Sequence, residues 1–220
     1  MSESVHFSQK IAYLPVEFLP SRSTAQDMQA AEDIGLYRVA VRGRCQIAHS
    51  FQGECFGTAQ ALHGCTYIVD AVCEGPQLKA SANYLVDICL AEKALQDALG
   101  CYHERNLDEL PEFKSENTTC ERVARAVWER MAAQLPGPPE LTALRIIVKE
   151  SDVAHVEYYR ELGPGAPPAV YTVSVRGRFM AARSLRSSRF AKPQQRLHGG
   201  TFIVDAHFSG TRLEPTANYL

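Results

Sequence analysis

The stretch "ALHGCTYIVDA" (Ala61–Ala71) is part of an internal repeat, because a similar stretch, "RLHGGTFIVDA" (Arg196–Ala206), occurs later in the chain. Both copies keep a His-Gly pair that is followed by β-branched and aromatic residues, a composition typical of a strand. The copies differ at the residue after that glycine, which is Cys65 in the first and Gly200 in the second. Similarity of this kind within one chain indicates a duplicated structural unit.

The repeat extends to both sides of this stretch. "YRVAVRGRCQIAHS" before it returns as "YTVSVRGRFMAARS", and "KASANYL" after it returns as "EPTANYL". The second copy stops less than halfway through the length of the first. We therefore predict four parts: an N-terminal extension (1–36), a complete unit (37–162), a linker (163–169) and a partial second unit (170–220).

Hydrophobic periodicity predicts the elements of the complete unit. Strands are expected where apolar residues alternate or β-branched residues run together, and helices where apolar residues recur every three or four positions. The expected order is strand 37–47, strand 65–73, helix 86–99, helix 117–135 with Thr118 or Thr119 as N-cap, strand 144–151 and strand 154–162. This order predicts an α+β fold, a ββααββ antiparallel sheet with two helices on one face, followed by the two strands of the partial repeat.

Composition narrows the function classes. The 220 residues are 45% apolar and 22% charged, as in an ordinary globular protein, and the net charge of −2 gives no electrostatic case for nucleic acid or an anionic membrane. No apolar run approaches the roughly 18 residues that a membrane span needs. No secretory signal is visible, and seven cysteines form no regular framework, so we predict reduced thiols and a cytoplasmic protein.

One group of residues suits a metal. His63 and Cys65 are two positions apart at the start of a strand, so their side chains point to the same face. A hairpin partner can bring His49 to that face as well. Three such ligands suit a catalytic zinc, which keeps a fourth position open. The alternative, that Cys65 is only a small buried residue, stays open.

The ordered motifs resemble a known family. "IAHS", "LHGCTYIVDA", "LVDI", "YHERNLDELPEF", "NTTCERVARAVWERM" and "VKES" are together similar to the 6-pyruvoyl-tetrahydropterin synthase / 6-carboxytetrahydropterin synthase family. The resemblance covers residues 37–162 and, as a half copy, 171–220. It implies the tunnelling fold, in which ββααββ units form barrels with active sites between subunits, so a homo-oligomer is expected.

The resemblance also implies an activity. Family members are zinc-dependent lyases that convert dihydroneopterin triphosphate to a pyruvoyl or carboxy tetrahydropterin with loss of triphosphate, and the bacterial branch serves queuosine synthesis. The implied cofactor is Zn²⁺, held by His49, His63 and Cys65, with Cys65 at the position of a third histidine. In the half copy Arg183 and Gly200 stand at two of these positions, so no zinc is expected there.

Further site residues follow from the resemblance. Glu150 matches the pterin anchor, a role that suits a carboxylate because it accepts two parallel N–H bonds. His103 matches a catalytic histidine, although Tyr102 replaces the aspartate that orients it. The position of the family's catalytic cysteine holds Ala59, which leaves Cys55 as a nearby thiol.

Three functions remain. The first is a zinc-dependent lyase acting on a reduced pterin. The second is a non-catalytic pterin-binding or structural subunit of the same fold, which the substitutions at Cys65, Ala59 and Tyr102 favour. The third is another tunnelling-fold reaction on a purine or pterin, which keeps the glutamate anchor and needs no metal.

Overall fold

The computed structural model describes residues 36–185, 189 and 196–220. The predicted N-terminal extension, residues 1–36, lies outside this description apart from its last residue. All helices and strands below belong to the described part.

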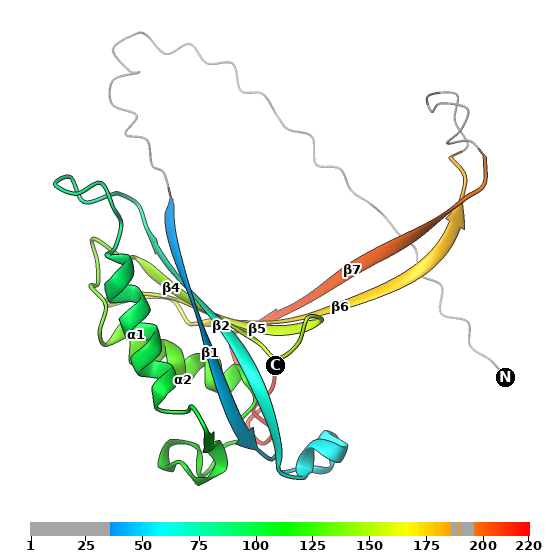
Figure 1. The fold of residues 1–220 in the computed structure, drawn as a ribbon, viewed down its shortest axis with the longest axis horizontal. Coiled ribbons are helices and arrows are strands. Elements are labelled where there is room, and N and C mark those ends of the chain that lie inside the picture. The colour runs from blue at the N-terminus through cyan, green and yellow to red at the C-terminus, as the bar shows by residue number, and fades with distance from the viewer. Residues whose placement is uncertain (1–35, 186–188, 190–195) are drawn as a thin grey trace. The chain divides into compact units, whose positions relative to one another are not determined.

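Seven strands form one sheet in the order β3-β1-β2-β4-β5-β6-β7 (Figure 1). Neighbouring strands are antiparallel, except for β1 and the two-residue β3 at the edge. The strands are β1 Tyr37–His49, β2 His63–Gly75, β3 Arg105–Asn106, β4 Ala143–Lys149, β5 Ala154–Glu161, β6 Val170–Arg183 and β7 His198–Gly210. The helices are α1 Ile88–Gly100 and α2 Cys120–Ala132, with short 3-10 helices η2 Glu54–Gln60, η3 Leu107–Glu109 and η4 Pro111–Phe113. The predicted α+β fold is confirmed.

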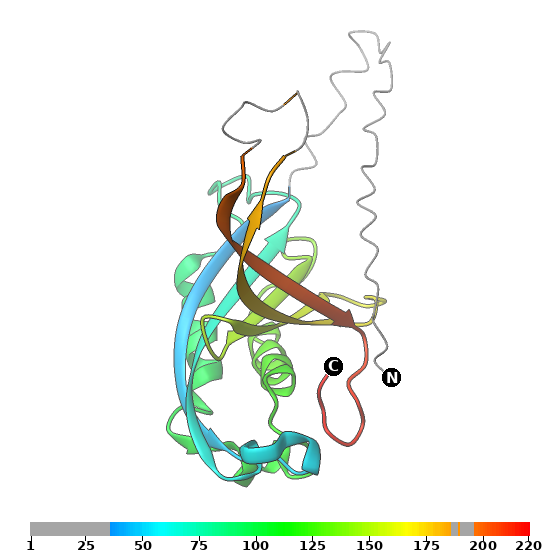
Figure 2. The same ribbon diagram turned by 90° about the vertical axis from the view of Figure 1, so that its right-hand side faces the viewer.

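Both long helices pack on one face of the sheet, α1 against β1 and α2 against β4 and β5 (Figures 1 and 2). Each starts later than its apolar pattern suggests, because a side chain caps it: Asp87 accepts the Cys89 N–H, and Thr119 accepts the Arg122 N–H. The buried stripe of α2 includes the predicted Val123, Val127 and Met131, so the helical spacing read from the sequence identifies the face that packs on the sheet.

The β6–β7 hairpin repeats the register of the β1–β2 hairpin. Tyr37 pairs with Gly75 in the first, and the equivalent Tyr171 pairs with Gly210 in the second. Each hairpin also carries an arginine that donates two hydrogen bonds to an aspartate on the neighbouring strand, as the Arg176–Asp205 pair illustrates with distances of 2.6 and 3.0 Å. The two hairpins are therefore similar in strand pairing as well as in sequence. The division of the chain into a complete and a partial unit stays a prediction.

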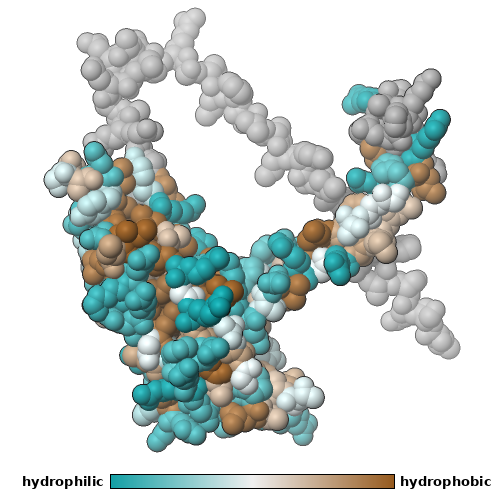
Figure 3. Space-filling model, in the orientation of Figure 1, coloured by the Kyte–Doolittle hydropathy of each residue, from teal (hydrophilic) through white to brown (hydrophobic). Residues whose placement is uncertain are grey.

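The two hairpins differ in what covers them. Cys45 and Val69 are buried under the helices, but Phe179 and Val204 at the equivalent positions of β6 and β7 are 53% and 48% exposed. Figure 3 shows hydrophobic residues at the surface along this second hairpin. Within the described residues no helix packs on them in the way that α1 packs on β1.

Gly43 lets α1 approach β1 closely, and this gives a test of the packing. A Cβ added at Gly43 would lie 2.6 Å from Cδ1 of the buried Leu99, whereas one at the equivalent Gly177 meets nothing within 4 Å. We expect Gly43→Ala to lower the free energy of unfolding by about 1–2 kcal/mol, because the helix must shift. Gly177→Ala is the matched control and should change it by less than about 0.5 kcal/mol. Urea denaturation measures both, and equal effects would contradict the proposed close approach.

Candidate functional site

The site begins with a pair of histidines where β1 ends and β2 starts. His49 and His63 are directly opposite in the ladder, and their ring centroids lie 4.6 Å apart. This pairing extends β1 two residues beyond the predicted end and starts β2 two residues before the predicted start. His49 is buried and His63 half-buried, so the sequence correctly predicted that the hairpin brings them together.

Backbone carbonyls orient both imidazoles. The Nδ1 atom of His49 is 3.0 Å from the Thr118 carbonyl, and that of His63 is 2.8 Å from the Ala61 carbonyl. Because a carbonyl only accepts, both Nδ1 atoms carry the proton, which leaves the Nε2 lone pairs available. The Nε2 atom of His49 is buried and has no partner among the described residues. Burial also lowers the pKa of His49, which favours the neutral ring.

A carboxylate that sequence reasoning missed supports this arrangement. Asp108 accepts the backbone N–H of Ser50 at 2.8 Å and its hydroxyl at 2.7 Å. Its other oxygen lies 3.2 Å from the Thr118 hydroxyl, which donates to it. Asp108 therefore holds the residue whose carbonyl orients His49. Asp108 belongs to the motif "YHERNLDELPEF", which could have indicated a role for it. The sequence predicts only a helix cap for Thr118, so it does not reveal the contact between the two residues.

A second group of side chains links Cys65 to Glu150. Tyr67 is buried next to Cys65 on the same face of β2, and its hydroxyl lies 3.7 Å from the thiol of Cys120. That thiol in turn donates to the Glu150 carboxylate at 3.5 Å. Burial raises the pKa of Cys65, and it raises the pKa of Cys120 well above the usual thiol value. Both sulfurs are thus thiols rather than thiolates at neutral pH.

The predicted zinc ligands fit a metal only in part. His49 and His63 have the features of metal-binding imidazoles, namely Nδ1 bound to a carbonyl and a free Nε2. The third predicted ligand, Cys65, has a raised thiol pKa and would have to lose its proton to bind a metal, and nowhere in residues 36–185, 189 or 196–220 do three His, Cys, Asp or Glu side chains gather to hold one. The three-residue zinc site stays a prediction.

The two predicted catalytic residues lie apart from this group. His103 accepts the Gln46 N–H with its Nδ1 and is about half exposed at the edge of the sheet. Tyr102 beside it is buried and accepts a hydrogen bond from Arg130, so it does not orient His103. Cys55 is exposed in η2. No hydrogen bond or ion pair between described residues joins His103 or Cys55 to Glu150.

Glu150 stands between two pockets. It follows directly after β4 and is exposed. One pocket, of about 220 Å³, has Glu150 together with the aromatic side chains of Phe51, Phe56 and Tyr219 in its wall. The other, of about 490 Å³, has several charged side chains in its wall, among them Lys149 and Asp152, together with Glu150. The first pocket offers a carboxylate and aromatic walls, which suits a flat heterocycle with N–H donors.

The Asp108 network can be tested directly. We expect Asp108→Ala to lower the free energy of unfolding by about 1–3 kcal/mol, because it leaves the Ser50 and Thr118 donors without their acceptor. Asp152→Ala removes an exposed carboxylate without a partner among the described residues and should be nearly neutral. Thermal or urea unfolding measures the difference. Equal stabilities of the two variants would contradict the supporting role of Asp108.

The model of one protein family, described as 6-pyruvoyl tetrahydropterin synthase, matches residues 38–161. The 6-pyruvoyl tetrahydropterin synthase of Caenorhabditis elegans shares 19% identity over 54% of this chain and 91% of its own, with a TM-score of 0.48. The enzyme of Plasmodium falciparum shares 13% identity over 58% of this chain and 99% of its own, with a TM-score of 0.49.

No match was found among curated protein sequences. None of the helices in the described part is long and apolar enough to cross a membrane. The family model covers more than half of the chain, including the paired histidines and Glu150. The chain belongs to the 6-pyruvoyl tetrahydropterin synthase family.

Proposed function

We propose that this chain binds a reduced pterin against Glu150 and acts on it as a lyase, with dihydroneopterin triphosphate as the substrate. The observation that carries the proposal is the aromatic-walled pocket with the Glu150 carboxylate at its edge. A carboxylate can accept two parallel N–H bonds from the amidine-like edge of a pterin. The aromatic walls contact the ring faces and exclude water from these bonds.

The paired histidines supply the proton acceptor in this proposal. Elimination of triphosphate removes a proton from the substrate side chain while the bond to the leaving oxygen breaks. His49 and His63 each hold Nδ1 against a carbonyl and leave Nε2 without a hydrogen-bond partner among the described residues, and the Nε2 of the half-buried His63 can accept such a proton. Their Nδ1–H groups donate to the carbonyls of Thr118 and Ala61, which keeps the rings in this tautomer.

A second function has an observation in its favour. His103, which the resemblance assigns to catalysis, and Cys55, a thiol four residues before the family's cysteine position, are not joined to Glu150 by any hydrogen bond or ion pair within the described residues. A protein that binds a pterin without converting it would need Glu150 and the aromatic pocket alone. Release of triphosphate separates the two functions, because only the lyase produces it.

The resemblance also leads us to propose a homo-oligomer, a cytoplasmic location and a role in queuosine synthesis. Within the described part, β7 and the short β3 form the edges of the sheet. Unpaired strand edges favour pairing with another chain. Light scattering of the purified protein tests the oligomer, and a monodisperse monomer would contradict it.

Substitution of Glu150 tests the anchor. We expect Glu150→Gln to weaken binding of 7,8-dihydroneopterin about 10- to 100-fold, since a charge-assisted acceptor contributes roughly 1.5–3 kcal/mol. Glu161→Gln, at the end of β5, is the control and should bind as the wild type does. Fluorescence titration measures both, and triphosphate release from dihydroneopterin triphosphate reports turnover. Unchanged binding by Glu150→Gln would overturn the anchor.

Zinc binding is tested by completing the ligand set. If His49 and His63 hold zinc and position 65 faces them, Cys65→His should bind zinc at least about tenfold more tightly than the wild type, because imidazole binds zinc as the neutral ring whereas the buried Cys65 thiol must first lose its proton. His63→Ala should lose most of the zinc in both backgrounds. Competition with a coloured chelator measures the affinities. Equal affinities of the wild type and Cys65→His would show that residue 65 does not reach the pair.

A further inference from the structure

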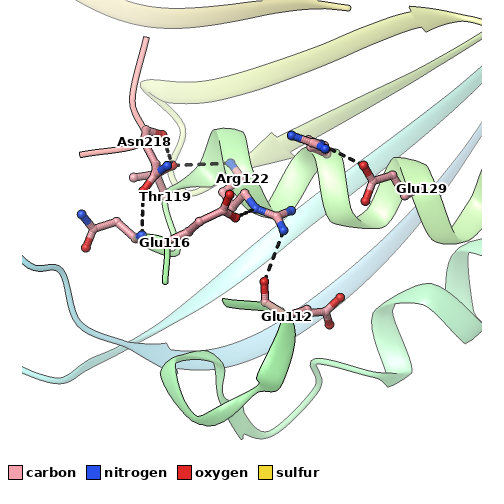
Figure 4. A network of polar contacts seen from close by, with 8 residues as sticks. Glu112, Glu116, Thr119, Arg122, Glu129 and Asn218 are labelled. Carbon is pink, nitrogen blue, oxygen red and sulfur yellow. Dashed lines mark hydrogen bonds and ion pairs between the residues drawn. The ribbon is translucent and has the colours of Figure 1, made fainter. Parts of the chain in front are cut away.

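The last seven residues of the chain dock onto the start of α2. The Asn218 side-chain oxygen accepts the backbone N–H of Asn117 at 2.8 Å, and the Asn218 carbonyl accepts the Thr119 hydroxyl at 2.6 Å. The Leu220 N–H donates to the carboxylate of Glu121 at 3.1 Å. Figure 4 shows Asn218 lying beside Thr119, where the helix begins. About a hundred residues of sequence separate the two sides of this contact.

The docked segment, which we call the C-terminal loop (Glu214–Leu220), is closed by its own hydrogen bonds. The Glu214 N–H donates to the Tyr219 carbonyl at 2.8 Å, and the Asn218 N–H donates to the Glu214 carbonyl at 2.9 Å. The Glu214 carboxylate accepts the N–H groups of Thr216 and Ala217. Asn218 adopts a φ of 62°, a left-handed conformation that asparagine tolerates well. The loop is therefore formed before a ligand arrives.

Docking brings Tyr219 to the Glu150 pocket. Its ring lies 6.0 Å from that of Phe56 in an edge-to-face arrangement, and both line the pocket with Glu150. The Tyr219 side chain makes no hydrogen bond within the described residues and is partly exposed. One of its edges is thus available to a ligand that enters beside the carboxylate.

We infer that the C-terminal loop forms a wall of the ligand site and that Tyr219 contacts the bound heterocycle and contributes to its selection. The inference rests on the proposed function, because it takes Glu150 as the anchor of the same ligand. Glu150 is exposed, so water competes for its acceptor oxygens. An aromatic ring over the pocket excludes that water and adds ring-to-ring contact, whose favourable centroid distances are about 4.5–7 Å. The site thereby receives residues from both halves of the chain.

The first half of the chain contains a matched control. The loop Lys79–Leu85 has the same "ANYL" sequence, the same bond from its first N–H to the tyrosine carbonyl, and Asn83 at a φ of 54°. Its Tyr84 is 41% exposed, as is Tyr219, but the Lys79 ammonium lies over the Tyr84 ring, and Tyr84 lines neither of the pockets that contain Glu150. Tyr84 therefore reproduces the local structure of Tyr219 without its place at the site.

The experiment compares Tyr219→Ala, Tyr219→Phe and Tyr84→Ala in the full chain, with 7,8-dihydroneopterin as the probe. We expect Tyr219→Ala to weaken binding at least about tenfold, Tyr219→Phe to bind within about threefold of the wild type, and Tyr84→Ala within about twofold. Hydrogen exchange at the Leu220 amide reports the docking of the loop independently. Protection retained in Tyr219→Ala would assign its loss of binding to the side chain itself.

Each outcome decides the question. Binding that survives Tyr219→Ala but is lost in Glu150→Gln overturns this inference and leaves the proposed function standing. Equal losses in Tyr219→Ala and Tyr84→Ala also overturn it, because a loop away from the pocket would then matter as much. A wild-type protein that does not bind dihydroneopterin overturns the proposed function and this inference with it.

Discussion

The register of the β1–β2 ladder is the constraint on which the site depends. Because side chains alternate across a strand, a slip of one residue would turn His49 away from the helices and separate it from its carbonyl partner at Thr118. The buried residues of both strands hold the register, since Val41 and Val69 must face the helices for the core to form. The packing that stabilises the fold thus also brings the two imidazoles together at the end of the ladder.

The groups around the site share a tendency to stay uncharged. Burial disfavours the protonated form of His49 and the thiolate forms of Cys65 and Cys120. Glu150 is exposed after β4 and accepts a hydrogen bond from the Cys120 thiol. Among the described residues, the wall of the aromatic pocket contains two carboxylates, those of Glu121 and Glu150, and neither lysine nor arginine, so it is suited to select a ligand by its N–H donors.

The sequence predicted what depends on periodicity and missed what depends on distant contacts. Alternation and helical spacing predict the strand and helix positions and the pairing of His49 with His63. Capping preferences predict a threonine N-cap for α2, which is Thr119 in the structure. Asp108 and the C-terminal loop escaped prediction because neither belongs to a periodic pattern: Asp108 acts through Thr118, and the loop reaches α2 from far along the chain. The position of His103 likewise depends on where the turn after α1 meets β1, which spacing does not determine.

These distant contacts distinguish the two copies of the internal repeat. At the two ligand positions the second copy has Arg183 and Gly200, and Gly200 has no side chain with which to coordinate. What it retains is the loop, and the same "ANYL" turn forms in both copies because the turn depends on local bonds and on an asparagine at positive φ. Of the two turns, only the one in the C-terminal loop lies at the start of α2, where Asn117 and Thr119 donate hydrogen bonds to it. Identical local structure therefore acquires different surroundings according to which strands precede it in the sheet. A hairpin that keeps only His198 of the three ligand positions can still contribute to a neighbouring site.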